Sequence, residues 1–390
     1  MSRINQWYSQ FKSHLKQLDL TILLTYITLS LIGLVIIYSA SMIPSQRIFG
    51  TPPDHYLVRQ GIFFIVGLFI IFIIYNFIPI KLFQHPRFQM IMVLFSLFLL
   101  IYTALFGEVV NGQRNWIYIG SIGIQPSEFI KVVVILYLAQ VFHARRHDLN
   151  NIKLYLAPLL LIAILAVGVI LQDLGTGAIV VAIIFAITLF SGVSLKAIGG
   201  AVIGAVISTF GLLGINYIST GQWLDNYQLG RFQTFINPFE DPLFQGYQIT
   251  NSLIAISRGG FTGSGIGEGI MKLGYLPEAH TDFIFAVLAE EFGLIGVLIV
   301  ITLFIILVFK LLHYAVKTKV MFYRIVIAGV ASYFAIQIFL NLGGISKLIP
   351  LTGVPLPLIS AGGSSFLSFS IAIGISLLVI KQIRKHEVTQ

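Results

Sequence analysis

The chain has 390 residues and a mean hydropathy of +0.93, with 57% hydrophobic and only 10% charged residues, a composition that excludes an ordinary water-soluble domain. Its net charge of +9 does not indicate a nucleic-acid-binding protein, because the basic residues are grouped in short connections between apolar stretches. No cysteine is present, which excludes disulfide bonds, thiol catalysis and cysteine-ligated metals.

Residues 1–19 form a polar segment before the first apolar stretch. Within it, Trp7, Phe11, Leu15 and Leu18 recur at helical spacing among three basic residues. This pattern suits a short amphipathic helix on the cytoplasmic, anionic leaflet of a membrane, and a solvated tail explains it equally well. The apolar stretch that follows has full spanning length, so we expect a retained first helix and not a cleaved signal peptide.

Ten stretches are long and apolar enough to be membrane spans, each of which takes about 20 residues of α-helix. The sequence therefore predicts an all-α integral membrane protein with about ten transmembrane helices. Residues 20–380 form a single membrane domain, and residues 381–390 form a cytoplasmic tail. The expected spans are 20–39, 61–79, 89–106, 128–142, 156–171, 177–192, 197–215, 283–309, 325–342 and 366–380.

The distribution of charge predicts the orientation, because lysine and arginine in short loops favour the cytoplasmic side. With the N-terminus inside, the inner connections carry 16 of the 24 basic residues. They carry only three of the 15 carboxylates, Asp19, Asp148 and Glu387. We therefore predict a multi-pass protein with cytoplasmic N- and C-termini.

The first polar stretch on the outer side covers residues 111–131, NGQRNWIYIGSIGIQPSEFIK. Pro126 suits the first position of a helix, and Glu128 and Lys131 would then share one face. Unpaired charge near the end of a span is costly, so the two form a structural ion pair or face a polar cavity. Arg114, beside Trp116, is either an interfacial residue or an anion ligand.

A long outer loop over residues 216–282, between the seventh and eighth spans, is the candidate working surface, because long loops in compact folds are usually functional. Within it, residues 247–258 predict a short amphipathic helix ending at Arg258. The glycine-rich run at 259–269, GGFTGSGIGEG, resembles an anion-binding nest of backbone N–H groups. No GK[ST] follows it and no strand precedes it, so a flexible loop is the favoured interpretation.

The densest group of ionisable residues, YLPEAHTDFIFAVLAEEFG at 275–293, stands where this loop enters the eighth span. Glu290 would lie about 12 Å deeper than Asp282 along a regular helix, so we expect Glu290 to be paired or neutral. Asp282 would lie near the interface, within reach of water and a lipid headgroup. It is the candidate general base for a membrane-bound substrate, with a helix cap or a salt-bridge network as the alternative.

Two further polar segments interrupt apolar sequence on the outer side. Asp173, in LQDLGTG, is a candidate N-cap of the following helix or a substrate ligand. Residues 341–366 mix proline, glycine and serine, and irregular backbone at membrane depth must be buried in protein or line a cavity. Gln337 and Asn341, one helical turn apart, are interpreted as interhelical hydrogen-bonding residues.

These motifs resemble those of the SEDS family (shape, elongation, division and sporulation), whose members include FtsW and RodA. The resemblance covers most of the chain in family order: NGQRNWIYIG, QPSEFIK, DLGTG, NPFEDPLFQGYQ, GYLPEAHTDFIFAVLAEEFG and PLTGVPLPLISAGGSS. It implies a peptidoglycan glycosyltransferase that polymerises lipid II, a lipid-linked disaccharide-pentapeptide, at the outer face of the bacterial cytoplasmic membrane during division or elongation. YLPEAHTDF and NPFEDPLFQGYQ are more similar to the division branch, FtsW.

By this resemblance, Asp282 is the catalytic residue, and Glu128, Lys131 and Arg114 occupy positions of family motifs. The reaction expels a lipid diphosphate, so we expect cations to neutralise it, and the candidates are Arg114, Lys131 and Arg258. We also place Glu128, Asp173 and His280 among the substrate-binding residues, with Glu128 orienting Lys131 and His280 helping to position Asp282. No metal ligand is assigned, and a divalent cation, Mg²⁺ or Mn²⁺, stays open as a cofactor.

The chain departs from the family pattern at three positions of the outer side. Gln172 stands before Asp173 where many members have proline, Ala361 stands in place of an aromatic residue, and Lys347 stands where a small or apolar residue is usual.

The implied partners are lipid II, a class B penicillin-binding protein, other membrane proteins of the division or elongation machinery, and membrane lipid, with no nucleic acid. Two other functions are open: a flippase that carries lipid II across the bilayer, and a noncatalytic scaffold that activates the penicillin-binding protein. Transporters usually show internal repeats and broken helices at the midplane. We find no convincing repeat, and the polar residues gather at one face, which favours an enzyme.

Overall fold

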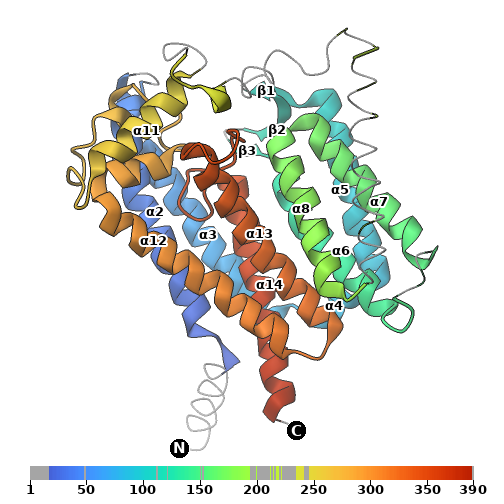
Figure 1. The fold of residues 1–390 in the computed structure, drawn as a ribbon. Helices are drawn as coiled ribbons and strands as arrows, with labels where there is room; N and C mark the ends of the chain where they lie inside the picture. Colours follow the sequence, from blue (N-terminus) through green and yellow to red (C-terminus); the bar gives the residue numbers. More distant parts are fainter. Residues whose placement is uncertain are drawn as a thin grey trace, which may run out of the picture.

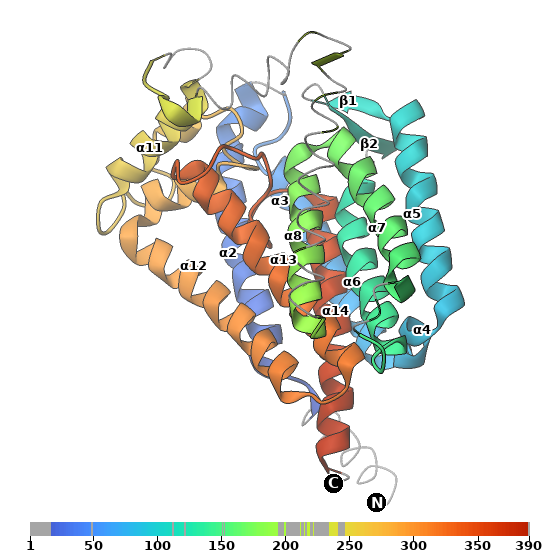
Figure 2. The ribbon, with the colours of Figure 1, turned by 45° about the vertical axis from the view of Figure 1, so that its right-hand side comes forward.

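The structure is a computed structural model that describes residues 17–47, 50–110, 113–120, 122–149, 151, 153–193, 199, 211, 214, 217–218, 221, 234–240 and 246–388. Within these residues the chain forms a bundle of long α-helices with a small sheet at one end (Figure 1), and Figure 2 shows the same arrangement turned by 45°. The predicted all-α integral membrane class is confirmed.

Eight helices of the described residues are long and apolar enough to cross a membrane. They are α2 (Leu20–Arg47), α3 (His55–Phe77), α5 (Pro86–Phe106), α6 (Pro126–Ala144), α8 (Leu174–Ser191), α12 (Ile284–Lys317), α13 (Met321–Ile345) and α14 (Gly363–Val388). The shorter α7 (Lys153–Gln172) is also apolar, so nine of the ten predicted spans fall on helices. The predicted span at 197–215 lies, apart from isolated positions, outside the described residues, and the count of ten stays a prediction.

The two ends of the bundle differ. Helix α2 begins and α14 ends at one end, here called the inner end, and the sheet and α11 (Tyr247–Gly259) lie at the opposite, outer end (Figure 1). At the inner end, Asp19 accepts hydrogen bonds from Arg384 Nη2 and from the Tyr314 hydroxyl, each over 2.7 Å. This buried cluster joins the start of α2 to the ends of α12 and α14. Of the predicted amphipathic segment at 1–19, only residues 17–19 are described.

Large apolar side chains are exposed along whole helices. Ile65 and Phe69 on α3 are 67% and 60% exposed, and Ile91 and Phe98 on α5 are 63% and 58% exposed. Apolar surface of this extent suits contact with hydrocarbon and not with water. The protein is therefore a multi-pass membrane protein.

A three-stranded antiparallel sheet connects α5 to α6, where the sequence analysis predicts no strand. Strands β1 (Glu108–Val110), β2 (Gln113–Ile119) and β3 (Ile122–Ile124) pair in that order. Two of them have only three residues, too few for the alternation of apolar and polar side chains that identifies a strand. The chain then enters α6 with Pro126 in its first turn, as predicted.

Helix α12 is broken at Gly293, whose φ of 60° and ψ of −163° are not helical. The glycine-rich run packs against this break: the N–H of Ser264 donates to the Glu290 carbonyl over 2.9 Å, and the N–H of Gly265 donates to the Glu291 carbonyl over 3.1 Å. These N–H groups satisfy carbonyl oxygens of the broken helix, so they are not available to an anion. The run is a fixed part of the α12 packing and not a free loop.

The carboxylates on the outer half of α12 are paired inside the protein. Glu290 is fully buried and accepts hydrogen bonds from the backbone at 270–271 and from Arg258 Nε, the last over 3.1 Å. Glu291 accepts from Ser39 Oγ over 2.7 Å and forms a salt bridge with Lys272 of the 3₁₀ turn η1 (Met271–Leu273). The pairing expected for Glu290 is confirmed, and these contacts hold α2, η1 and α11 against the start of α12.

Candidate active site

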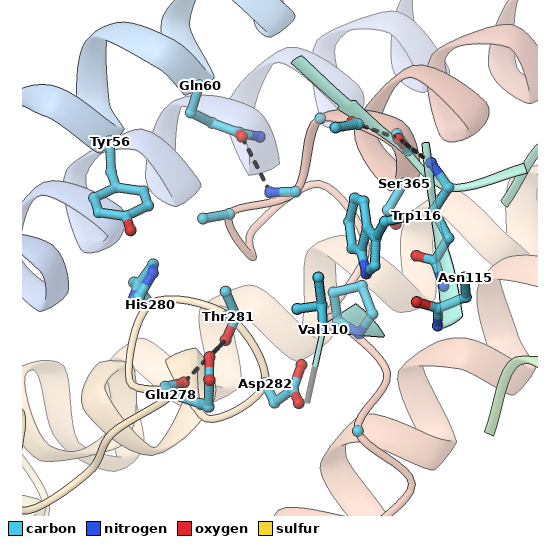
Figure 3. A pocket seen from close by; sticks show the side chains of 18 of the residues that line it. Tyr56, Gln60, Val110, Asn115, Trp116, Glu278, His280, Thr281, Asp282 and Ser365 are labelled. Atoms are coloured by element: carbon cyan, nitrogen blue, oxygen red, sulfur yellow. Dashed lines mark hydrogen bonds between the residues drawn. The ribbon is translucent and has the colours of Figure 1, made fainter. Parts of the chain in front are cut away.

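A cavity of about 430 Å³ lies at the outer end of the bundle. Its walls are the start of α3, the sheet, the start of α8, the loop before α12, and the segment at 353–365 that leads into α14 (Figure 3). The lining residues thus come from positions 56 to 365, which shows that the cavity is formed by packing of distant segments. Of the 341–366 segment, expected to be buried in protein or to line a cavity, residues 353, 355 and 361–365 line this cavity.

Asp282 is half-buried and lines this cavity, immediately before α12 begins. A tight turn carries it: Thr281 Oγ1 donates to Glu278 Oε2 over 2.6 Å, and the N–H of Phe283 donates to the Glu278 carbonyl over 3.1 Å. In Figure 3, Asp282 lies between Thr281 on one side and Asn115 of the sheet on the other. The candidate general base therefore faces a space that residues of two separate elements enclose.

The turn that carries Asp282 is held by the segment before α14. The N–H of Ala361 donates to the His280 carbonyl over 2.9 Å, and Ser360 Oγ donates to the Thr281 carbonyl over 2.6 Å. Ala361, one of the departures from the family pattern, lines the cavity. Lys347, another departure, instead donates to the Ile236 carbonyl over 3.3 Å and is not among the lining residues.

His280 is 6% exposed and also lines the cavity. Its ring packs against the ring of Tyr56 on α3, with centroids 4.4 Å apart (Figure 3). Burial lowers the pKa of His280, and the nearby Glu278 carboxylate opposes that shift. The imidazole is therefore held in its neutral form at neutral pH.

Asp173 is the N-cap of α8, one of the two roles that the sequence left open, and it also lies in the cavity wall. Its side chain caps α8, accepting from the N–H of Gly175 over 2.9 Å and from Thr176 Oγ1 over 2.6 Å. It is 8% exposed and also lines the cavity. The cap fixes the carboxylate in the cavity wall.

Glu128 and Lys131 form an ion pair of 2.8 Å that is buried below the cavity. Lys131 Nζ also donates to Gln337 Oε1 over 3.0 Å, and Gln337 Nε2 donates to the Pro355 carbonyl over 2.9 Å. Pro355 lines the cavity, whereas neither Glu128 nor Lys131 does. The pair thus supports the cavity wall through Gln337 and, in this structure, does not reach the space where a substrate would bind.

The other two predicted cations are also absent from the cavity wall. Arg114 is exposed on β2, between the lining residues Gln113 and Asn115. Arg258, at the end of α11, pairs with Glu290 and is 43% exposed. Of the predicted site residues, Asp282, His280 and Asp173 line one cavity, whereas Glu128 and the predicted cations Arg114, Lys131 and Arg258 are not among its lining residues.

Three lining residues on the first turns of α3 are missing from the predicted site: Tyr56, Arg59 and Gln60. Arg59 is the only lysine or arginine among the described lining residues. The available signal is a cluster of polar residues at the start of an apolar helix, HYLVRQ, which hydropathy analysis treats as an ordinary interface. Their partners in the cavity come from residues more than 200 positions later, which no local pattern indicates.

Three carboxylates, Asp173, Glu278 and Asp282, line the cavity. Over the described part of the chain, no group of three or more His, Asp or Glu side chains is arranged to hold a metal ion.

Comparison with known proteins identifies the family. The model of the cell cycle protein family FtsW/RodA/SpoVE matches residues 19–386, nearly the whole chain. The chain belongs to this family. The FtsW/RodA/SpoVE family model therefore covers every element that lines the cavity.

The chain is similar to several proteins that carry the name probable peptidoglycan glycosyltransferase FtsW. It is 39% identical to that of Bacillus subtilis (strain 168) over 374 residues, which are 94% of this chain and 93% of the relative. It is 36% identical to that of Coxiella burnetii over 366 residues, covering 93% and 95% of the two chains. The similarity to FtsW proteins agrees with the division-type motifs.

Two solved structures share the fold. One is a chain of a peptidoglycan synthase complex that coordinates polymerization and crosslinking, with a TM-score of 0.72, 26% identity, and coverage of 94% of this chain and 98% of that chain. The other is the rod shape determining protein RodA of Thermus thermophilus, with a TM-score of 0.67, 24% identity, and coverage of 94% and 97%. The helical architecture of the FtsW/RodA/SpoVE family is thus confirmed for this chain.

Proposed function

We propose that this protein, a peptidoglycan glycosyltransferase, polymerises lipid II in the outer-end cavity with Asp282 as the general base. The observation that carries the proposal is the half-buried Asp282 carboxylate in the wall of a cavity that also contains polar groups from α3, the sheet and the segment before α14. A lipid-anchored sugar approaches such a site from the membrane, so its polar head meets the carboxylate at the water-lipid boundary.

The proposed reaction joins two sugars. The 4-hydroxyl oxygen of an acceptor N-acetylglucosamine attacks C1 of a donor N-acetylmuramic acid and forms the new O–C1 bond. The bond between C1 and the diphosphate oxygen breaks, and the lipid diphosphate leaves with the electron pair of that bond. Asp282 takes the hydroxyl proton, a role that contributes about 10²- to 10⁴-fold for a well-positioned carboxylate.

The leaving diphosphate needs a cation in a site that excludes bulk water. We propose Arg59 for this role, because it is the only lysine or arginine among the described lining residues. Arg114 stays a second candidate, since its neighbours on β2 line the cavity. Lys131 and Arg258 are engaged with Glu128 and Glu290, so we propose that they act on the scaffold and not on the substrate.

We propose a location in the bacterial cytoplasmic membrane, with both termini in the cytoplasm and the cavity at the outer face. The concentration of basic residues in the inner connections supports this orientation. A class B penicillin-binding protein is the proposed partner, alongside other proteins of the division machinery and membrane lipid. The similarity to a chain of a synthase complex that couples polymerization to crosslinking supports that partner.

A polymerisation assay tests the proposed function. The purified protein, alone and with a copurified penicillin-binding partner, is given lipid II, and glycan strands are resolved on a gel in the presence of a moenomycin-type inhibitor of unrelated polymerases. We expect polymer from the native chain and none from Asp282→Asn, while Glu268→Gln, which alters an exposed carboxylate outside the cavity, stays active. A flippase or a scaffold gives no polymer in either form, and full activity of Asp282→Asn removes Asp282 from the mechanism.

A further inference from the structure

Three buried side chains that line the cavity each keep an atom without a hydrogen-bond partner among the described residues, and one of them is Asn115 on the sheet, whose Oδ1 is unpaired. The other two are Gln60, 4% exposed, whose Nε2 is unpaired, and His280, 6% exposed, whose Nδ1 is unpaired. Both residues line the cavity. Buried polar atoms in native proteins are normally hydrogen-bonded, so the unpaired Gln60 Nε2 and His280 Nδ1 indicate a bound ligand.

The orientation of the Gln60 amide is fixed by the backbone. Its Oε1 accepts a hydrogen bond from the N–H of Gly362 over 3.3 Å, as Figure 3 shows. Rotating the amide by 180° would bring its NH₂ group against that N–H donor, so the observed orientation is favoured. The unpaired atom of this lining residue is therefore the Nε2 donor.

Gln60 and His280 are linked through the segment before α14, because they accept hydrogen bonds from consecutive residues of it. The His280 carbonyl accepts from the N–H of Ala361, and Gln60 accepts from the N–H of Gly362. Tyr56, one turn before Gln60 on α3, packs against the His280 ring. Phe63, three residues after Gln60, lines the same wall and adds apolar surface.

The Gln60 donor, the imidazole nitrogen of His280 and the apolar surface of Phe63 together indicate a neutral ligand group. Such a group accepts a hydrogen bond from Gln60, forms a second one with His280 Nδ1, and carries a small apolar part. An acetamido group has these properties: its carbonyl oxygen accepts, its N–H donates, and its methyl group is apolar. A hydroxyl group lacks the apolar part, and an anion has no N–H to donate.

We propose that Gln60 and His280 form the subsite for the acetamido group of the terminal N-acetylated sugar of the acceptor. This inference rests on the proposed function, in which that sugar presents its hydroxyl to Asp282. Gln60 donates to the acetamido carbonyl, His280 accepts from the acetamido N–H, and Phe63 contacts the methyl group. Gln60 is thus a residue that determines sugar specificity.

Equilibrium binding measured in the Asp282→Asn background tests the subsite without turnover. Two probes are compared in lipid nanodiscs: lipid II, and a lipid II analogue in which glucose replaces the terminal N-acetylglucosamine. We expect Gln60→Met to weaken lipid II binding by about 5- to 20-fold, the effect of one lost hydrogen bond and an unpaired ligand group. The glucose analogue should bind the parent more weakly by a similar factor, and Gln60→Met should not weaken it further.

Two further variants keep the test decisive. Gln60→Glu preserves the acceptor for Gly362 and removes the donor, so it should weaken lipid II binding even if Gln60→Met unfolds. Gln89→Met replaces another buried glutamine, on α5 outside the cavity, and should leave both affinities unchanged. If Gln60→Met and Gln60→Glu weaken both probes equally, or neither, the acetamido subsite is wrong.

The binding and polymerisation results separate the two proposals. If polymer forms but the affinity for lipid II does not depend on Gln60, the acetamido subsite is wrong and the proposed glycosyltransfer step stands. Binding that depends on Gln60 without polymer formation rejects the glycosyltransfer step and keeps the subsite. Failure of the parent to bind lipid II overturns both.

Discussion

The side-chain amide of Asn341 on α13 donates to the main-chain carbonyl of Asp282 over 2.9 Å and to that of Val354 over 2.8 Å. One buried side chain, 4% exposed, therefore joins the turn that carries Asp282 to the segment before α14, which also lines the cavity. Asn341, interpreted from the sequence as an interhelical hydrogen-bonding residue, is a positioning residue for the proposed base.

Asn341→Ala removes both hydrogen bonds and leaves two carbonyl oxygens without their donor. We expect kcat for polymerisation to fall by about tenfold while KM for lipid II changes less, because the misplaced carboxylate affects the reacting geometry more than ground-state binding. Steady-state kinetics across lipid II concentrations measure this split. Ser376→Ala, which removes a buried 2.9 Å hydrogen bond to the Ala372 carbonyl within α14, is the control. An equal loss of kcat in both variants would mean that Asn341 acts only on stability.

The Glu128–Lys131 pair gives a prediction about stability. Lys131→Met leaves the Glu128 carboxylate buried without its cation, which typically costs about 3–5 kcal/mol. The double variant Glu128→Gln, Lys131→Met removes both charges and should recover most of that loss. Thermal unfolding in detergent measures the three proteins. A double variant no more stable than Lys131→Met would contradict a mainly structural role for the pair.

Two glycines of the glycine-rich run form a matched pair. A Cβ atom at Gly263, where φ is +82°, would lie 2.1 Å from the Glu291 carbonyl oxygen, whereas at Gly267, where φ is +86°, it would meet nothing within 4 Å. Gly267→Ala should therefore cost only the left-handed backbone strain of about 1–2 kcal/mol. Gly263→Ala should lower the free energy of unfolding clearly more, because the glycine-rich run would also have to move away from the break in α12. Comparable melting temperatures for the two variants would contradict the close packing of Gly263 against the Glu291 carbonyl.

The neutral state of buried His280 predicts how stability depends on pH. Burial lowers its folded-state pKa below the ordinary value of 6.5, so the unfolded chain binds a proton more readily. His280 therefore contributes no pH dependence well above 6.5 and an increasing loss of stability as the pH falls from 6.5 toward the folded-state pKa. His280→Phe keeps a ring against Tyr56 and cannot titrate. The difference in melting temperature between the native protein and this variant, followed from pH 7.5 to pH 5 at about half-unit steps, should shift in favour of the variant. A constant difference would show that His280 does not titrate on unfolding.

The predicted spans, the helix at 247–258 and the pairing of Glu128 with Lys131 follow from local rules. Span length follows from hydropathy summed along the chain, and a carboxylate three residues before a lysine on one helix has few other partners at membrane depth. The placement of Asp282, His280 and Asp173 in one cavity came from motif resemblance and agrees with the geometry. The sheet at 108–124 was missed because its short strands carry too little periodic signal.

By itself, the sequence determined that the chain is a helical membrane protein and which carboxylate stands immediately before α12. Those properties depend on transfer free energies and charges that act residue by residue. Only the tertiary structure decided which cation lines the cavity, that Lys131 and Arg258 are paired elsewhere, and that Gln60 and His280, more than 200 residues apart in the chain, line the same cavity. Such contacts depend on how helices pack, and packing is a property of the whole bundle that no single segment encodes.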